Sequence, residues 1–129
     1  MSSGAVHGYP ESAMVANATQ ANLYRAQKMH TDNNEVVLAE ANSDMSIGFN
    51  QTITTAANQP IHVKVAGFTL ASSDAGWTRG DKLTPTTGGQ LVTTTTAGHL
   101  VCAIAQDTVA TDELGEVLIV SPAIRYDGF

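Results

Sequence analysis

The sequence predicts a mainly β protein, a small β-barrel or β-sandwich, and three observations support this prediction. Short apolar segments recur at close spacing after residue 35, glycine and proline separate them, and a run of threonines at residues 93–96 favours extended backbone. The length of 129 residues fits one domain of ordinary size. Because residues 1–45 lack sustained periodicity, we expect an extended, partly irregular N-terminal arm at 1–45 and the β domain at 46–129.

One segment of this arm, residues 12–30, has two open interpretations. Apolar and small side chains fall near one face of a helix, and Ala, Gln, Arg and Lys have good helix propensity. Its asparagine and threonine side chains compete for backbone hydrogen bonds and favour an extended chain. An extended arm would gain by laying its apolar side chains on another chain. The alternative is a short helix packed on the protein's own sheet.

The clearest strand is expected at residues 61–65, just after Pro60. Apolar and polar residues alternate there, which predicts that Ile61, Val63 and Val65 are buried and that His62 and Lys64 face water. Weaker β signals precede it at residues 36–38, 46–49 and 51–54. We therefore expect the chain to be mainly β from residue 36 onward.

The C-terminal half predicts a hairpin and two long strands. A strand at residues 81–84 is joined by a glycine turn at 85–89 to a strand at 90–94. The continuous apolar run at 100–105 is typical of a strand covered on both faces, so we predict that it is central in its sheet. A last strand follows at 116–120, and Pro122 is expected to end it.

Composition and charge exclude several classes of partner. The net charge of −6 disfavours binding to nucleic acid, because no counterion release would drive it. No apolar stretch approaches the roughly 20 residues that cross a bilayer, and the N-terminus lacks the pattern of a secretory signal. The single cysteine, Cys102, lies inside an apolar run and is expected to be a buried, inert thiol in a protein made in a reducing cytoplasm.

No pattern of residues predicts an enzyme, a cofactor site or a metal site. The four histidines are far apart, and none has a second ligand at a helical interval; they are His7, His30, His62 and His99. Gly88 and Gly89 lack the lysine of a phosphate loop, and Ser72 and Ser73 lack the glycines of a nucleophile elbow. The acidic pair Asp112-Glu113 is expected to form a solvated turn. The tripeptide Arg79-Gly80-Asp81 is expected to be a turn that leads into a strand.

Four segments in the last half of the chain carry a family resemblance. They are Trp77-Thr78-Arg79-Gly80-Asp81-Lys82-Leu83, Gly89-Gln90-Leu91-Val92, residues 97–105 and residues 115–120. Their order, a G-D-x-L turn, G-x-L-V, an apolar strand ending in alanine, a small-residue turn and V-L-I-V, resembles the head decoration (capsid cement) proteins of tailed bacteriophages. The resemblance is one of strand order and turn placement.

The resemblance implies a compact β-barrel or β-tulip domain that forms a homotrimer at local threefold positions on the outside of an expanded head. It implies the major capsid protein as partner, no cofactor, and a virion location after synthesis in the bacterial cytoplasm. Six arm residues are then expected to contact the capsid: Met14, Val15, Leu23, Tyr24, Arg25 and Met29. Trp77 is either an interface anchor or half-buried core, and Tyr126 and Phe129 either cap the barrel or reach a neighbour.

Two other classes of function stay open. A different virion component, such as a small fibre or tail adaptor domain, would share the β-rich and threonine-rich composition. A small enzyme or ligand-binding barrel would instead need a concave apolar pocket with converging polar groups.

Overall fold

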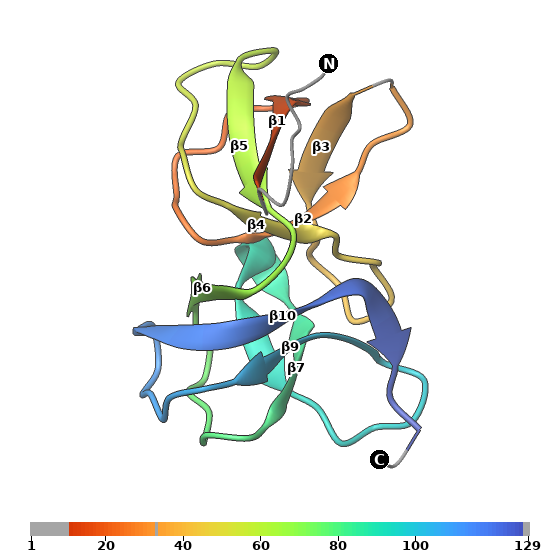
Figure 1. Cartoon of the computed structure of the whole chain (residues 1–129), viewed down its shortest axis with the longest axis vertical. Coiled ribbons are helices and arrows are strands. Elements are labelled where there is room, and N and C mark those ends of the chain that lie inside the picture. The colour runs from red at the N-terminus through yellow and green to blue at the C-terminus, as the bar shows by residue number, and fades with distance from the viewer. Residues whose placement is uncertain (1–10, 33, 128–129) are drawn as a thin grey trace.

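The computed structural model describes residues 11–32 and 34–127, whose strands form two units that follow one another along the long axis of the molecule (Figure 1). The first unit is a closed barrel in the order β1-β3-β2-β4-β5, and the second is a five-stranded sheet in the order β6-β10-β9-β7-β8. The prediction of a mainly β fold is therefore confirmed. Among the described residues, no helix is long and apolar enough to span a membrane.

The first unit contains the strand that the sequence predicts most clearly. In β5, Ile61 and Val63 are fully buried and His62 is exposed, so the alternating pattern is confirmed for these three residues. Lys64 and Val65 are both half-buried, and Val65 lies beyond the end of the strand. The five strands of the barrel are β1 Glu11–Ala16, β2 Ala26–Met29, β3 Glu35–Leu38, β4 Gly48–Asn50 and β5 Pro60–Lys64.

The segment that we expected to be an arm supplies three strands of this barrel. β1 pairs with β5 on one side and with β3 on the other, which closes the barrel. The sequence of β2, Ala-Gln-Lys-Met, has good helix propensity, but pairing with β3 and β4 overrides it. The expected boundary at residue 45 is thus wrong for the described residues, because strands on both sides of it form one barrel. Residues 1–10 of the expected arm lie outside the described residues.

The second unit places β9 at the centre of its sheet, between β10 and β7. This confirms the prediction from the apolar run at 100–105. β10 is longer than expected: it continues past Pro122, because the pairing with β9 shifts register between Ile119 and Ile124 and needs no proline N–H there. The strands are β6 Phe68–Ser72, β7 Lys82–Pro85, β8 Leu91–Thr93, β9 Leu100–Ala105 and β10 Leu114–Arg125. A short 3-10 helix, η1, spans Thr87–Gly89 in the turn of the predicted hairpin.

The two units have similar connectivity. In each, the first strand pairs with the fifth, the second pairs with the third and the fourth, and the fourth pairs with the fifth. In the first unit β1 also pairs in parallel with β3 and closes the barrel, whereas in the second unit Ser73, just after β6, forms a single parallel bridge with Leu91 of β8. The two units therefore share most of one five-stranded topology, closed in the first and open in the second.

A shared core joins the two units. Phe49 of β4 is fully buried and belongs to the same hydrophobic cluster as Leu83 and Leu91 of the second unit. Hydrogen bonds cross the junction as well, since Gly88 receives one from the Arg25 guanidinium and donates one to the Glu40 carboxylate, both 2.9 Å long. The junction is therefore part of one core cluster, while the first barrel keeps a second cluster of its own around Val36, Ile61 and Val63.

Candidate functional site

Exposed apolar side chains gather on the outer face of β6 and β10. Phe68, Leu70, Leu114 and Leu118 are each between 39% and 50% exposed, whereas the residues that alternate with them point inward. We call the surface made by these four side chains the β6–β10 face. An apolar cluster of this kind on a sheet is typical of a contact with another protein.

The strand register extends one row of this face to β9. The exposed Glu116, opposite Leu70, lies between Leu114 and Leu118 on the same side. Phe68 lies directly opposite Leu118, and Leu118 lies opposite Ile104 of β9, so the three side chains cross three neighbouring strands. Lys82 of β7 lies opposite Ile104 and ends the row with a basic group. Because cross-strand partners share one face of a sheet, the row is apolar over most of its width.

The residues expected to contact the capsid do not form one surface. Met14 packs against the core cluster of the first barrel, while Met29 is 69% exposed near the end of β2. Both line a hollow of about 290 Å³ beside the turn between β2 and β3. Val15 is half-buried in β1. Whether any of these residues meets a capsid stays a prediction.

Leu23, Tyr24 and Arg25 lie in a separate place, the loop that precedes β2. Asn50 holds this loop, because its side chain accepts the Arg25 N–H at 2.7 Å and its carbonyl accepts the Tyr24 N–H at 3.0 Å. The Arg25 guanidinium donates to Gly88 of the second unit at 2.9 Å. Arg25 therefore connects the two halves of the chain, and Leu23, 40% exposed, is the most exposed of the three.

The aromatic candidates occupy different environments. Trp77 is 4% exposed and belongs to the core, next to Val109 and over Gly115. Of its two interpretations, the core is the one that the structure supports. Tyr126 is half-buried, and its backbone pairs with His99. Phe129 lies outside the described residues.

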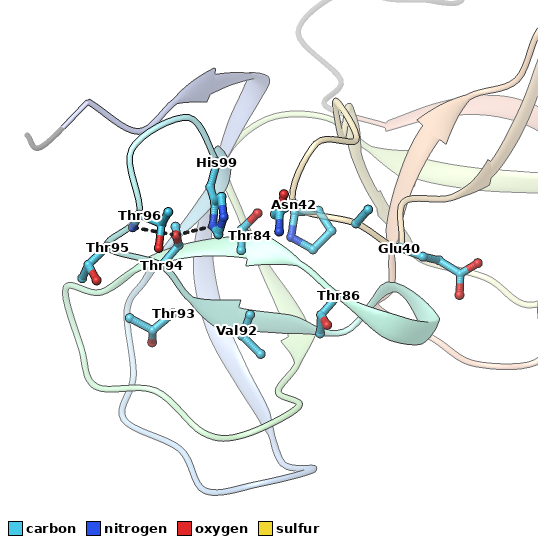
Figure 2. A pocket seen from close by; sticks show the side chains of 12 residues that line it. Glu40, Asn42, Thr84, Thr86, Val92, Thr93, Thr94, Thr95, Thr96 and His99 are labelled. Atoms are coloured by element: carbon cyan, nitrogen blue, oxygen red, sulfur yellow. Dashed lines mark hydrogen bonds between the residues drawn. The ribbon is translucent and has the colours of Figure 1, made fainter.

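A polar cleft of about 390 Å³ opens between the loop after β3 and the threonine-rich end of β8 (Figure 2). In Figure 2 the Thr94 hydroxyl joins the His99 ring at 2.8 Å and accepts the Thr96 N–H at 3.2 Å. Thr84, on the floor of the cleft, has a buried hydroxyl without a hydrogen-bond partner. No lysine or arginine lines the cleft, so it presents hydroxyl and amide groups with little positive charge.

The nucleophile candidates are held in structural contacts. Burial raises the pKa of the Cys102 thiol far above its ordinary value, which keeps it protonated and unreactive. The Ser73 hydroxyl accepts the Gly76 N–H, and the Ser72 hydroxyl accepts a hydrogen bond from Gln90. These three groups stabilise the second unit.

The Arg79-Gly80-Asp81 turn is bound within the fold. The Arg79 guanidinium donates to the Gln106 carbonyl at 2.9 Å, and the Asp81 carboxylate accepts the Thr78 N–H at 2.8 Å. The expectation that Arg79-Gly80-Asp81 forms a turn leading into a strand is therefore confirmed.

The acidic pair Asp112-Glu113 also lies in a turn. Asp112 is exposed and has a positive φ of 61°, and Glu113 accepts the Ala110 N–H at 2.8 Å. The expectation of a solvated turn is confirmed.

One cluster of potential ligands was not expected from the sequence. The side chains of His30, Asp32 and Glu35 bring their ligand atoms within 4.8 Å of one another at the turn between β2 and β3. Their spacing is not a helical ligand interval, so only the hairpin brings them together.

Comparisons with known proteins identify a likeness of fold. No family model matches the chain, and no curated protein matches it. Among solved structures, it is similar to the N base of the head fibre protein gp8.5 of bacteriophage phi29, with a TM-score of 0.65 and 16% sequence identity. The match covers 88% of this chain and 96% of that one, so both units take part in it. The chain shares its fold with the base of a phage head fibre.

Proposed function

We propose that this protein is a structural component of a tailed-phage virion and is attached to the outer surface of the head. The fold likeness to a head fibre base, over nearly the whole of both chains, is the observation that carries the proposal. The order of strands and turns in residues 77–120, which resembles head decoration proteins, supports the same location by a separate route.

The role we propose is binding without catalysis. The groups that could act as nucleophiles are buried or hydrogen-bonded within the fold, as described for Cys102, Ser72 and Ser73. The second unit instead exposes an apolar sheet face. Such a surface fits a protein whose work is to hold other subunits.

We propose further that the chain binds the major capsid protein through the β6–β10 face and forms a homotrimer that cements neighbouring capsid subunits. A trimer at a threefold position repeats one small contact three times, which raises the overall affinity without any new contact within each chain. Binding through this face would bury four exposed apolar side chains and remove them from water, which favours the contact. They are Phe68, Leu70, Leu114 and Leu118.

A head fibre base is the second candidate, and the fold likeness favours it directly. It differs from a cement protein in what it carries: a fibre base supports a further projecting element, whereas a cement protein bridges capsid subunits. Both candidates require attachment to the head.

Cryo-electron microscopy of the virion tests the location and separates the two candidates. We expect density for both β units on the outer face of the head. Contacts to two or more capsid subunits at many threefold positions would indicate cement, and density that continues outward as a fibre would indicate a base. Purified virions that lack this chain, or that carry it only in the tail, would contradict the proposal.

Light scattering of the purified protein tests the homotrimer. A mass of three chains in solution, or three chains around one position on the head, is the expected result. A single chain at each site on the particle would refute the trimer but not the head location.

A further inference from the structure

The turn between β2 and β3 brings three metal-ligating side chains together. His30 Nδ1 lies 3.5 Å from an Asp32 carboxylate oxygen, and both lie within 4.8 Å of a Glu35 carboxylate oxygen. Backbone pairing fixes their spacing, since Met29 lies opposite Val36 and the His30 N–H donates to the Glu35 carbonyl at 2.9 Å. The hairpin thus holds the two ends of the cluster in register.

The His30 ring nitrogen nearest this cluster already accepts a hydrogen bond. Its Nδ1 accepts the backbone N–H of Asp32 at 3.1 Å. An unprotonated ring nitrogen is the form of histidine that binds metal ions. A bound cation would take the lone pair that now accepts the Asp32 N–H.

Glu35 is oriented by a residue outside the hairpin. One of its carboxylate oxygens accepts the side-chain N–H of Asn17 at 2.8 Å, and Asn17 directly follows β1. This contact fixes the carboxylate and leaves its other oxygen for a further ligand. Hydrogen bonds of this kind from outside the ligand set are typical of metal sites.

The hollow beside the cluster has no permanently charged cation to neutralise the two carboxylates. Its lining contains neither lysine nor arginine, and its basic group is His30 itself. The volume of about 290 Å³ admits a cation together with its water ligands.

We propose that His30, Asp32 and Glu35 bind a divalent cation of the Zn²⁺ type, with water completing its coordination. One nitrogen and two carboxylate ligands suit Zn²⁺, Co²⁺ or Mn²⁺ better than Ca²⁺ or Mg²⁺, which prefer oxygen ligands alone. Ligand atoms of a tetrahedral zinc site are roughly 3.3 Å apart, given bonds of about 2.0–2.1 Å. The His30–Asp32 pair, at 3.5 Å, is already near that spacing, and the Glu35 ligand atom lies within 4.8 Å of both.

The cation would tie β1 to the β2–β3 hairpin, because Asn17 and Glu35 connect the two through one carboxylate. This inference does not depend on the proposed virion role. A failure of the experiment below would leave the proposed virion role unaffected.

Calorimetric titration of the full chain with zinc chloride, with Mn²⁺ line broadening in an amide NMR spectrum, tests the site. We expect one Zn²⁺ per chain and broadening centred on residues 29–36. His30→Gln and Asp32→Asn should each weaken binding at least tenfold, and Asn17→Ala about tenfold. Asp32 is exposed, so Asp32→Asn remains informative even if His30→Gln disturbs the fold.

Two matched histidine variants serve as controls. His62→Gln, on the exposed side of β5, should leave zinc binding unchanged. His7→Gln examines the histidine outside the described residues and should also have no effect. The proposal is overturned by an absence of binding at millimolar zinc, by unchanged binding in Asp32→Asn and His30→Gln, or by loss of binding in His7→Gln alone.

Discussion

Gly48 and Lys64 lie backbone against backbone where β4 meets β5. A Cβ atom at position 48 would overlap the carbonyl oxygen of Lys64 and would also press on Val63. Both strands belong to the closed barrel, so neither can move aside without opening it. Glycine is therefore required at this position by close approach.

We expect Gly48→Ala to lower the free energy of unfolding by about 2–3 kcal/mol, the cost of overpacking against backbone that cannot yield. Unfolding in urea, monitored by circular dichroism, measures this change in the free energy of unfolding. Gly67→Asn is a suitable control, because the space around Gly67 is open and asparagine tolerates its positive φ. A Gly48→Ala variant as stable as the wild type would show that the strands can separate.

The buried side-chain amides of Gln20 and Gln27 bind each other at 2.6 Å. We expect Gln27→Leu to destabilise the protein by about 1–3 kcal/mol, because Gln20 would keep a buried amide without its partner. Replacing both by leucine should cost less than the sum of the single changes. A double-mutant cycle by chemical unfolding tests this, and strictly additive effects would contradict the pairing.

Asp44 should make stability depend on pH at the acid end. Burial acts to raise the pKa of this carboxyl, but the Glu40 N–H and the Lys28 ammonium stabilise its ionised form and hold the pKa below the ordinary value of 3.8. Its contribution is therefore complete above pH 3.8 and is lost as the pH falls through the lower folded value.

Accordingly, Asp44→Asn should lower stability at pH 7 by about 1 kcal/mol, and the difference from the wild type should shrink in strong acid. Lys28→Met removes the ion pair but keeps the Glu40 N–H contact, so it should retain part of this pH dependence. Unfolding curves from pH 7 downward measure both. A difference that stays constant down to pH 2 would argue against the assignment.

Cys102 should be protected from thiol reagents in the native protein. It is almost fully buried in β9, and burial raises its pKa, so little thiolate exists at pH 8. We expect a maleimide to react with it only after guanidinium chloride unfolds the chain, as read by mass spectrometry. Rapid labelling of the folded protein would mean that the second unit opens readily.

The β6–β10 face should be needed for binding to heads but not for folding. Replacing Phe68 and Leu118 together by serine removes apolar area from exposed positions, so we expect a near-native unfolding curve. Binding to undecorated heads should fall at least tenfold in a sedimentation assay. Met45→Ser with Ile53→Ser, at exposed apolar positions away from this face, is the matched control.

Loss of binding in both double variants would indicate a general need for apolar surface. Normal head binding with loss of the trimer, in the Phe68→Ser and Leu118→Ser variant, would instead assign the face to contacts between copies of the chain.

The sequence by itself determined the β class and the strands with strong patterns. Alternation at Ile61–Val63 and the continuous apolar run at 100–105 were sufficient, because period-two burial and burial on both faces leave direct traces in the order of residues. The turn chemistry of Gly88 and Gly89 likewise predicted the hairpin, since both glycines adopt positive φ.

Only the tertiary structure decided that residues 11–32 and 34–45 belong to the first unit and that the two units share most of one topology. The strand Ala26–Met29 is built of residues that favour a helix, and it becomes a strand because β3 and β4 supply its hydrogen bonds. The same holds for the candidate sites: His30 meets Glu35, and Phe68 meets Leu118, through strand pairing. Pairing between segments far apart in the chain depends on the whole fold, and local residue order does not encode it.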